Sequence, residues 1–132
     1  IDPLEEHAAL RIEFQGVFAF ASVAGQWHGR RLTALTVANT RCTDLTAEAA
    51  FERWYDEHHL ADIVGGGGFY AGARFVAPLL GPGEPRHIAI YKTDLDTLAA
   101  ASEATAKSRA TRTRTPPTLE RIWGGGFVPY RF

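Results

Sequence analysis

Residues Leu32 to Val64 read LTALTVANTRCTDLTAEAAFERWYDEHHLADIV, and this stretch decides the fold. Its opening part, 32–38, is rich in β-branched residues and predicts a strand with at least one buried face. Asp44 and the threonines beside it are typical capping residues, and the run that begins at Ala47 predicts a helix to about Val64. The stretch therefore predicts a strand followed directly by a helix.

The rest of the chain continues this alternation. Four consecutive glycines after Val64 end the helix, because glycine loses too much backbone entropy inside a regular element. A turn with two prolines separates the next two strands, and Thr93 with Asp96 resembles a capping box for a second helix. The elements predicted after the glycines are strands over 69–76 and 86–92, a helix over 95–110, and a last strand over 119–132 that is bulged at Gly124–Gly126.

The predicted order from Arg31 onward is β-α-β-β-α-β, which is typical of an α+β fold of the ferredoxin-like kind with an antiparallel sheet. Two helices cover only one face of such a sheet, so we expect a second copy of the chain to cover the other face in a homodimer. We assign this domain to 31–132. Residues 1–30 form an amino-terminal extension, in which the alternation around Leu10–Phe14 indicates an extra strand or hairpin, or alternatively a helix.

Composition excludes several classes of protein. The chain has 132 residues, of which 45% are hydrophobic and 22% charged, as in an ordinary globular domain. Its net charge of -1 provides no global field that would attract nucleic acid or an anionic membrane. No apolar run approaches the ~20 residues that a membrane helix needs, and the acidic opening is not expected to be a signal peptide. A single cysteine, Cys42, fits a cytoplasmic protein without disulfides.

Three motifs carry a family resemblance. FERWYDEHHLAD (51–62), GFYAGARF (68–75) and RHIAIY (86–91) together resemble the dimeric α/β-barrel superfamily, especially its EthD-like small bacterial members. The resemblance covers roughly residues 31–130. It implies the dimeric barrel fold, and it implies reactions such as polyketide cyclisation, dehydration, decarboxylation, lactone isomerisation or cofactor-free oxygenation, besides haem binding. A shared fold does not transfer any one of these reactions.

The helix supplies the candidate catalytic residues. At about 100° per residue, His58 and Asp62 share an arc and could meet, and a carboxylate beside an imidazole prepares a general base. His59 lies at the edge of this arc, but the resemblance makes His59 the first candidate for catalysis and His58 the second. Arg74, in an apolar strand, could hold a carboxylate, phenolate or enolate. The alternative pairs Arg74 with Asp62 or Glu57 at the edge of the sheet.

Aromatic side chains are the candidates for substrate binding. They could line a cleft for a flat ring, or they could simply pack in the core and in the dimer interface. We expect no metal site, because adjacent histidines on a helix point about 100° apart. The basic run at 107–114 lacks interleaved aromatics and indicates a solvated surface. The candidate binding residues are Phe51, Trp54, Tyr55, Tyr70, Tyr91 and Trp123.

The sequence therefore predicts an enzyme without a cofactor that uses histidine acid-base chemistry on a small aromatic or polyketide-like substrate. His59 or His58 would move a proton, Asp62 would orient the histidine, and Arg74 or a tyrosine would stabilise an oxyanion. Two alternatives stay open. One is a cofactor-independent monooxygenase of hydroxyaromatics, and the other is a non-catalytic protein that binds a small ligand or haem.

Overall fold

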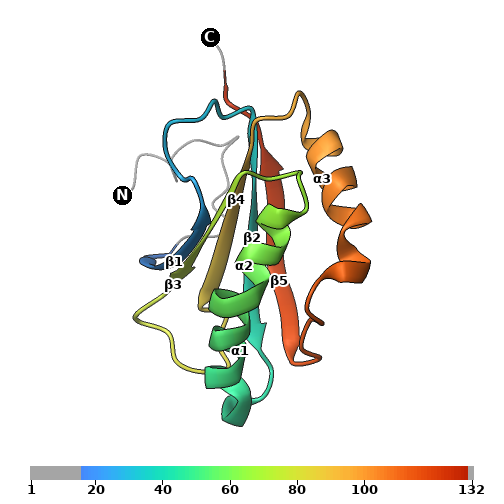
Figure 1. Ribbon diagram of the computed structural model, residues 1–132. Helices are drawn as coiled ribbons and strands as arrows, with labels where there is room; N and C mark the ends of the chain where they lie inside the picture. Colours follow the sequence, from blue (N-terminus) through green and yellow to red (C-terminus); the bar gives the residue numbers. More distant parts are fainter. Residues whose placement is uncertain (1–15, 131–132) are drawn as a thin grey trace, which may run out of the picture.

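The predicted strands assemble into one antiparallel sheet, which the computed structural model describes over residues 16–130 (Figure 1). A helical run and a second helix lie together on one face of this sheet. The strands are β1 (Ala19–Gly25), β2 (Ala34–Cys42), β3 (Ala71–Val76), β4 (His87–Thr93) and β5 (Leu119–Phe127), and the α-helices are α1 (Glu48–Trp54), α2 (Leu60–Gly65) and α3 (Leu98–Lys107).

The strand order is β1-β3-β4-β2-β5, and every neighbouring pair is antiparallel. Strand β4 lies between β2 and β3, so the helical run α1–α2 connects two parallel strands across the strand that separates them. This arrangement confirms the predicted α+β class with an antiparallel sheet, and it is compatible with the ferredoxin-like order. Strand β1 adds to the edge beside β3, as expected for an extra strand, whereas the alternation around Leu10–Phe14 lies outside the described residues.

Alternation along the strands separates two faces of the sheet. On the helix side, Tyr91 and Ala89 of β4 join Phe51, Trp54 and Leu60 in one buried cluster. The side chains of the opposite face include an apolar group that surrounds a hollow of about 280 Å³. That group consists of Phe18, Val37, Phe75, Ile88, Ile90 and Trp123.

Three details of the predicted elements were wrong. Helix α3 begins after Thr97, whose hydroxyl accepts a hydrogen bond from the Ala100 amide (3.1 Å). Thr93 cannot cap it because Thr93 ends β4 and its buried hydroxyl donates to the Gly68 carbonyl (2.7 Å). The bulge in β5 falls at Ile122, where the pairing with β2 shifts, and not at the three glycines. β5 also ends at Phe127.

The glycine run after α2 ends the helix as predicted, and two of its members are required there. Gly67 has φ +83°, a left-handed conformation that residues with a Cβ rarely adopt. A Cβ on Gly68 would overlap the carbonyl oxygen of Ala101. This glycine therefore lets the loop pass against α3. No helix within 16–130 is both long and apolar enough to cross a membrane.

Candidate functional site

The helix that carries the histidines contains a π-helical turn at Tyr55–His59, between α1 and α2. The amide of Leu60 donates to the carbonyl of Tyr55, five residues back, as in a π-helix. In a regular α-helix, residues five apart would lie about 140° apart around the axis. Here the His59 imidazole instead stacks on the Trp54 indole, with ring centroids 4.3 Å apart and planes 24° apart.

His59 is enclosed by aromatic rings. The edges of Tyr55 and Tyr91 meet its imidazole at centroid distances of 5.3 and 6.4 Å. Burial, the largest effect, and the charge of Arg112 together lower the pKa of His59 to about 4, although Asp62 opposes the shift. The imidazole is therefore neutral at pH 7. His58 is exposed, so of the two histidines the structure brings only His59 among the predicted aromatics.

His59 lines a hollow of about 350 Å³ beneath the segment that follows α3. Arg109 and Arg112 line this hollow and also a neighbouring cleft of about 480 Å³ between α2, α3 and the sheet, which we call the α2–α3 cleft. Asp62 accepts a hydrogen bond from the Thr113 amide (2.9 Å), which ties the segment that carries Arg112 to α2. Asp62 thus positions the arginine segment, and no hydrogen bond joins it to either histidine.

Tyr91 belongs to the sheet wall of the α2–α3 cleft. Its side chain is only 7% exposed, and its hydroxyl makes no hydrogen bond within the described chain. Burial raises the pKa of Tyr91 well above its usual value, so the hydroxyl stays protonated and is available as a donor. A Cβ on Gly72 would come within 2.7 Å of the Tyr91 ring. This glycine thus leaves the space that the ring occupies.

Three arginines contribute to the lining of the α2–α3 cleft: Arg109, Arg112 and Arg121. Arg121 folds back along β5 over Gly124, where any Cβ would overlap its guanidinium group. No sequence motif joined these residues as a group. Arg109 and Arg112 belong to the basic run at 107–114, which was expected to be a solvated surface, and Arg121 comes from a different strand. Only the fold brings them together.

Arg74 lies away from this cleft, beneath α1. Its guanidinium forms two hydrogen bonds with the Asp56 carboxylate (2.7 and 2.9 Å) and approaches Nδ1 of His87 (3.2 Å). The Arg74 side chain is 5% exposed. Burial opposes the ionisation of Asp56, but the hydrogen bonds from Arg74 and Ser22 and the charge of Arg74 outweigh it and lower the pKa of Asp56. Arg74 therefore pairs with Asp56 of the helix, and the predicted pairing with Asp62 or Glu57 was wrong.

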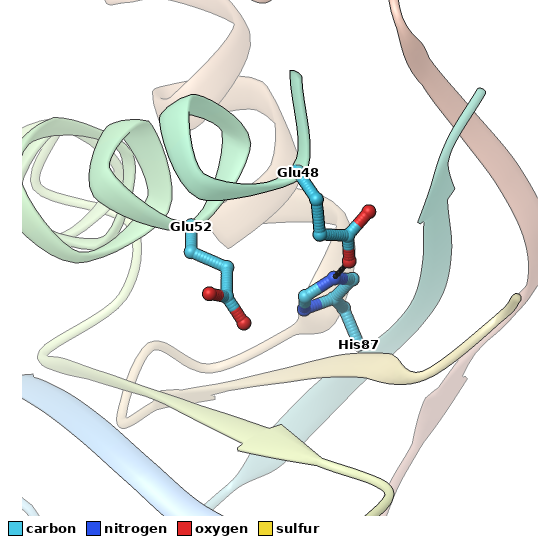
Figure 2. Close-up of side chains that lie close together, drawn as sticks. All are labelled: Glu48, Glu52 and His87. Carbon is cyan, nitrogen blue, oxygen red and sulfur yellow. Dashed lines mark hydrogen bonds and ion pairs between the residues drawn. The ribbon is translucent and has the colours of Figure 1, made fainter. Parts of the chain in front are cut away.

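A second buried cluster extends this network. Figure 2 shows Glu48 and Glu52 of α1 beside His87 of β4, with Nε2 of His87 2.8 Å from Oε1 of Glu48. Because the Arg74 guanidinium can only donate, Nδ1 of His87 accepts, and Nε2 carries the proton that is donated to Glu48. Burial, the largest effect, lowers the pKa of His87. The sequence placed His87 in the RHIAIY motif at the start of a strand and did not indicate its pairing with Glu48.

The three ligand atoms of this cluster lie within 4.8 Å of one another, close enough for one metal ion. However, Arg86 already neutralises the two glutamates, at 3.2 Å from Glu52 and 3.6 Å from Glu48. The Arg74 guanidinium occupies the remaining nitrogen of His87. Two fixed cations at the same point oppose a third positive charge, so the arrangement suits a structural ion-pair network between α1 and the sheet.

The remaining predicted binding residues do not lie together at one site. Phe51, Trp54 and Tyr55 join Tyr91 in the buried cluster on the helix side. Tyr70 lies under the guanidinium of Arg30, 5.0 Å from its ring centroid. Trp123 contributes to the hollow on the opposite face. Comparison of the chain with protein-family models, with curated proteins and with solved structures finds no match.

Proposed function

We propose that this protein is an enzyme that moves a proton on a small organic molecule, with the neutral imidazole of His59 as the base, and that this molecule extends from the hollow beside His59 into the α2–α3 cleft. The observation that carries the proposal is the position of His59. Its ring is fixed by Trp54 and faces a hollow that shares Arg112 with the cleft. Titratable groups with strongly shifted pKa values beside a cleft are typical of catalytic sites.

The proposed step needs no redox partner. His59 removes a proton from a carbon next to a carbonyl group, and the electron pair of the broken C–H bond forms an enolate. The charge of Arg112 and the hydroxyl of Tyr91 are the groups of the cleft that can stabilise the enolate oxygen. The protonated imidazole then returns its proton, either to another carbon in an isomerisation or to a departing hydroxide in a dehydration.

A low pKa suits the second half of this step. With a pKa of about 4, the imidazolium of His59 is a strong acid and returns its proton readily. The same low value means that His59 is present almost entirely as the free base at neutral pH. These reactions belong to the types found in the dimeric α/β-barrel superfamily that the motifs resemble, and we propose that the chain is a member of it.

We further propose that the sheet face opposite the helices is covered by a second copy of the chain. Phe20 is 63% exposed there, Val23 48% and Phe127 47%. The Phe20 ring meets the edge of Phe75, which borders the apolar hollow on the same face. An apolar sheet face buries its side chains well against an identical face around a two-fold axis. A net charge of -1 offers little repulsion between copies.

Proton exchange in heavy water tests the proposed reaction without knowledge of the natural substrate. We would follow deuterium incorporation by proton NMR at the activated carbons of phenylpyruvate, 3-oxo-5-phenylpentanoate and 3,5-dihydroxyphenylacetate. The wild type should exceed buffer with at least one probe. His59→Gln should lose about 10²-fold or more of that exchange.

His58→Gln is the matched control, because His58 is exposed on the same helical turn. This variant should keep the wild-type exchange rate. Equal rates for His59→Gln and the wild type would contradict the assignment of His59 as the base. If the wild type exchanges none of the three probes faster than buffer alone, the alternative is favoured, namely a protein that binds small molecules without catalysis.

A further inference from the structure

The charge of the α2–α3 cleft is unbalanced. Arg109, Arg112 and Arg121 line it, whereas no aspartate or glutamate within residues 16–130 does. Among the described residues, none of these three guanidinium groups forms an ion pair or a side-chain hydrogen bond, although seven other basic side chains of this small domain do, as exemplified by Arg74 and Arg86. Arginines that converge on a cleft with their donors unused are a ready site for an oxyanion.

Tyr91 supplies an independent observation. Tyr91 lines the same cleft, and its hydroxyl is buried without a hydrogen-bond partner among the described residues. The loss of a hydrogen bond by a buried polar group costs about 1–3 kcal/mol. A ligand oxygen would restore this bond. Arg112 lies close enough for its positive charge to favour lower pKa values for Tyr91 and His59. The charge of Arg121 likewise opposes the rise in the pKa of Tyr55 that burial causes.

The rest of the cleft combines apolar walls with the hydroxyl-bearing side chains of Thr36, Ser102 and Thr105. Ile63, Phe69 and Leu98 form walls, and Gly125 and Gly126 leave one part of the sheet without side chains. A Cβ on Gly126 would overlap the Leu98 side chain, so the glycine keeps this strand close to α3. A volume of about 480 Å³ lies within the usual range for small-molecule sites.

We infer that the α2–α3 cleft binds an apolar molecule of about two fused rings that carries one oxyanion group, held by Arg112 and Arg121 with a hydrogen bond from Tyr91. The inference names the substrate class for the proposed function and shares its site. It concerns binding, so it can hold or fail independently of proton transfer by His59. A guanidinium group can donate two hydrogen bonds to either a carboxylate or a phosphate. The probes described next distinguish these two types of oxyanion.

The test compares three probes that share one ring system: 2-naphthoate, 2-naphthyl phosphate and the neutral 2-naphthamide. Binding is measured by shifts of backbone amide signals in ¹⁵N-labelled protein. At least one of the anions should bind at least tenfold more tightly than the amide, with the largest shifts around Tyr91 and Gly125. The tighter anion identifies the oxyanion type. Equal affinity of the amide and both anions, or no binding by any probe, would overturn the inference.

Variants locate the anion. Arg112→Gln and Arg121→Gln should each weaken the preferred anion about tenfold and leave the amide unchanged. Arg112→Lys and Arg121→Lys keep the charge but lose the fork, so they should give intermediate affinities. Lys107→Gln is the matched control, because Lys107 lies at the end of α3, is 77% exposed and pairs with Glu103. A loss of affinity in Lys107→Gln equal to that in the arginine variants would indicate general surface charge and overturn the assigned site.

His59→Gln separates this inference from the proposed function. If this variant loses proton exchange but binds the preferred anion as the wild type does, both stand. If anion preference is intact while the wild type shows no exchange, the cleft still binds anions and only the catalytic proposal fails. Well-dispersed amide spectra for each variant verify that the fold is retained. Retained affinity in both Arg→Gln variants would place the anion elsewhere and refute the inference.

Discussion

The imidazole of His59 lies face to face with the indole of Trp54, five positions earlier in the chain, at a centroid distance of 4.3 Å. The π-helical turn at Tyr55–His59 produces this stack, because it brings residues five apart over one another. The stack fixes the ring plane of His59 and removes much of the ring from water. Both effects prepare a neutral base at the wall of the hollow that it shares with Arg112.

Stability should depend on pH through His59. Its pKa is about 4 in the folded chain and 6.5 in the unfolded chain, so the unfolded state binds more protons between these values. The free energy of unfolding should therefore fall as the pH drops from about 6.5 to about 4, by up to about 3 kcal/mol from this residue. Urea unfolding at pH 7 and pH 4.5 measures the change.

His59→Gln provides the control for this pH dependence. Glutamine does not titrate, so the drop in stability between pH 7 and pH 4.5 should be smaller by most of the His59 contribution. A remaining drop is expected from His87, whose pKa burial also lowers. If the variant and the wild type lose the same free energy over this interval, the buried, neutral state of His59 is wrong.

The Arg74–Asp56 pair should be a major contribution to stability. Arg74→Met would leave the Asp56 carboxylate with only the Ser22 hydroxyl as a donor and the Nδ1 atom of His87 with none, and breaking a buried pair costs about 3–5 kcal/mol. The Asp56 side chain is 36% exposed, so we expect the lower end of this range. Lys107→Met breaks the exposed pair with Glu103 and should cost less than about 0.5 kcal/mol. Similar losses in the two variants would contradict this view of the network.

Glycines of one run should differ sharply in their tolerance of alanine. Gly68→Ala would place a Cβ against the Ala101 carbonyl, which is backbone and cannot easily move, so we expect a loss of about 1–3 kcal/mol. A Cβ on Gly65 has nothing within 4 Å, and this residue ends α2. Gly65→Ala should therefore be neutral or stabilising by about 0.5–1 kcal/mol. Thermal unfolding of the pair tests the close approach of the loop to α3.

The proposed dimer depends on the exposed apolar face. Phe20→Glu should leave the single chain folded, because Phe20 is 63% exposed, but it should bury a charge in the proposed interface. Light scattering after size-exclusion chromatography should show a dimer for the wild type and a monomer for the variant. Leu79→Glu changes an 86% exposed side chain in the loop between β3 and β4 and should remain dimeric. A monomeric wild type would contradict the proposed dimer.

The sequence predicted the main elements because their signals are local. β-Branched runs, the capping Asp44 and the glycines after α2 each act within a few residues, and the structure places strands, a cap and a helix end there. The errors had non-local causes. Thr93 resembled a cap, but its hydroxyl is taken by the Gly68 carbonyl from a distant part of the chain. The bulge followed the strand pairing at Ile122, which the sequence of one strand does not encode.

By itself, the sequence determined the class of the fold and the presence of an aromatic helix with two histidines. Helical periodicity placed His58 on the aromatic arc and the family resemblance favoured His59. The structure encloses His59, because a π-helical turn changes the angular spacing that a regular helix would give. The tertiary structure also pairs Arg74 with Asp56. It brings Arg112, Arg121 and Tyr91 together at the α2–α3 cleft. Periodicity reports which face of its own element a residue occupies, whereas the groups that meet across elements are set by packing between distant segments.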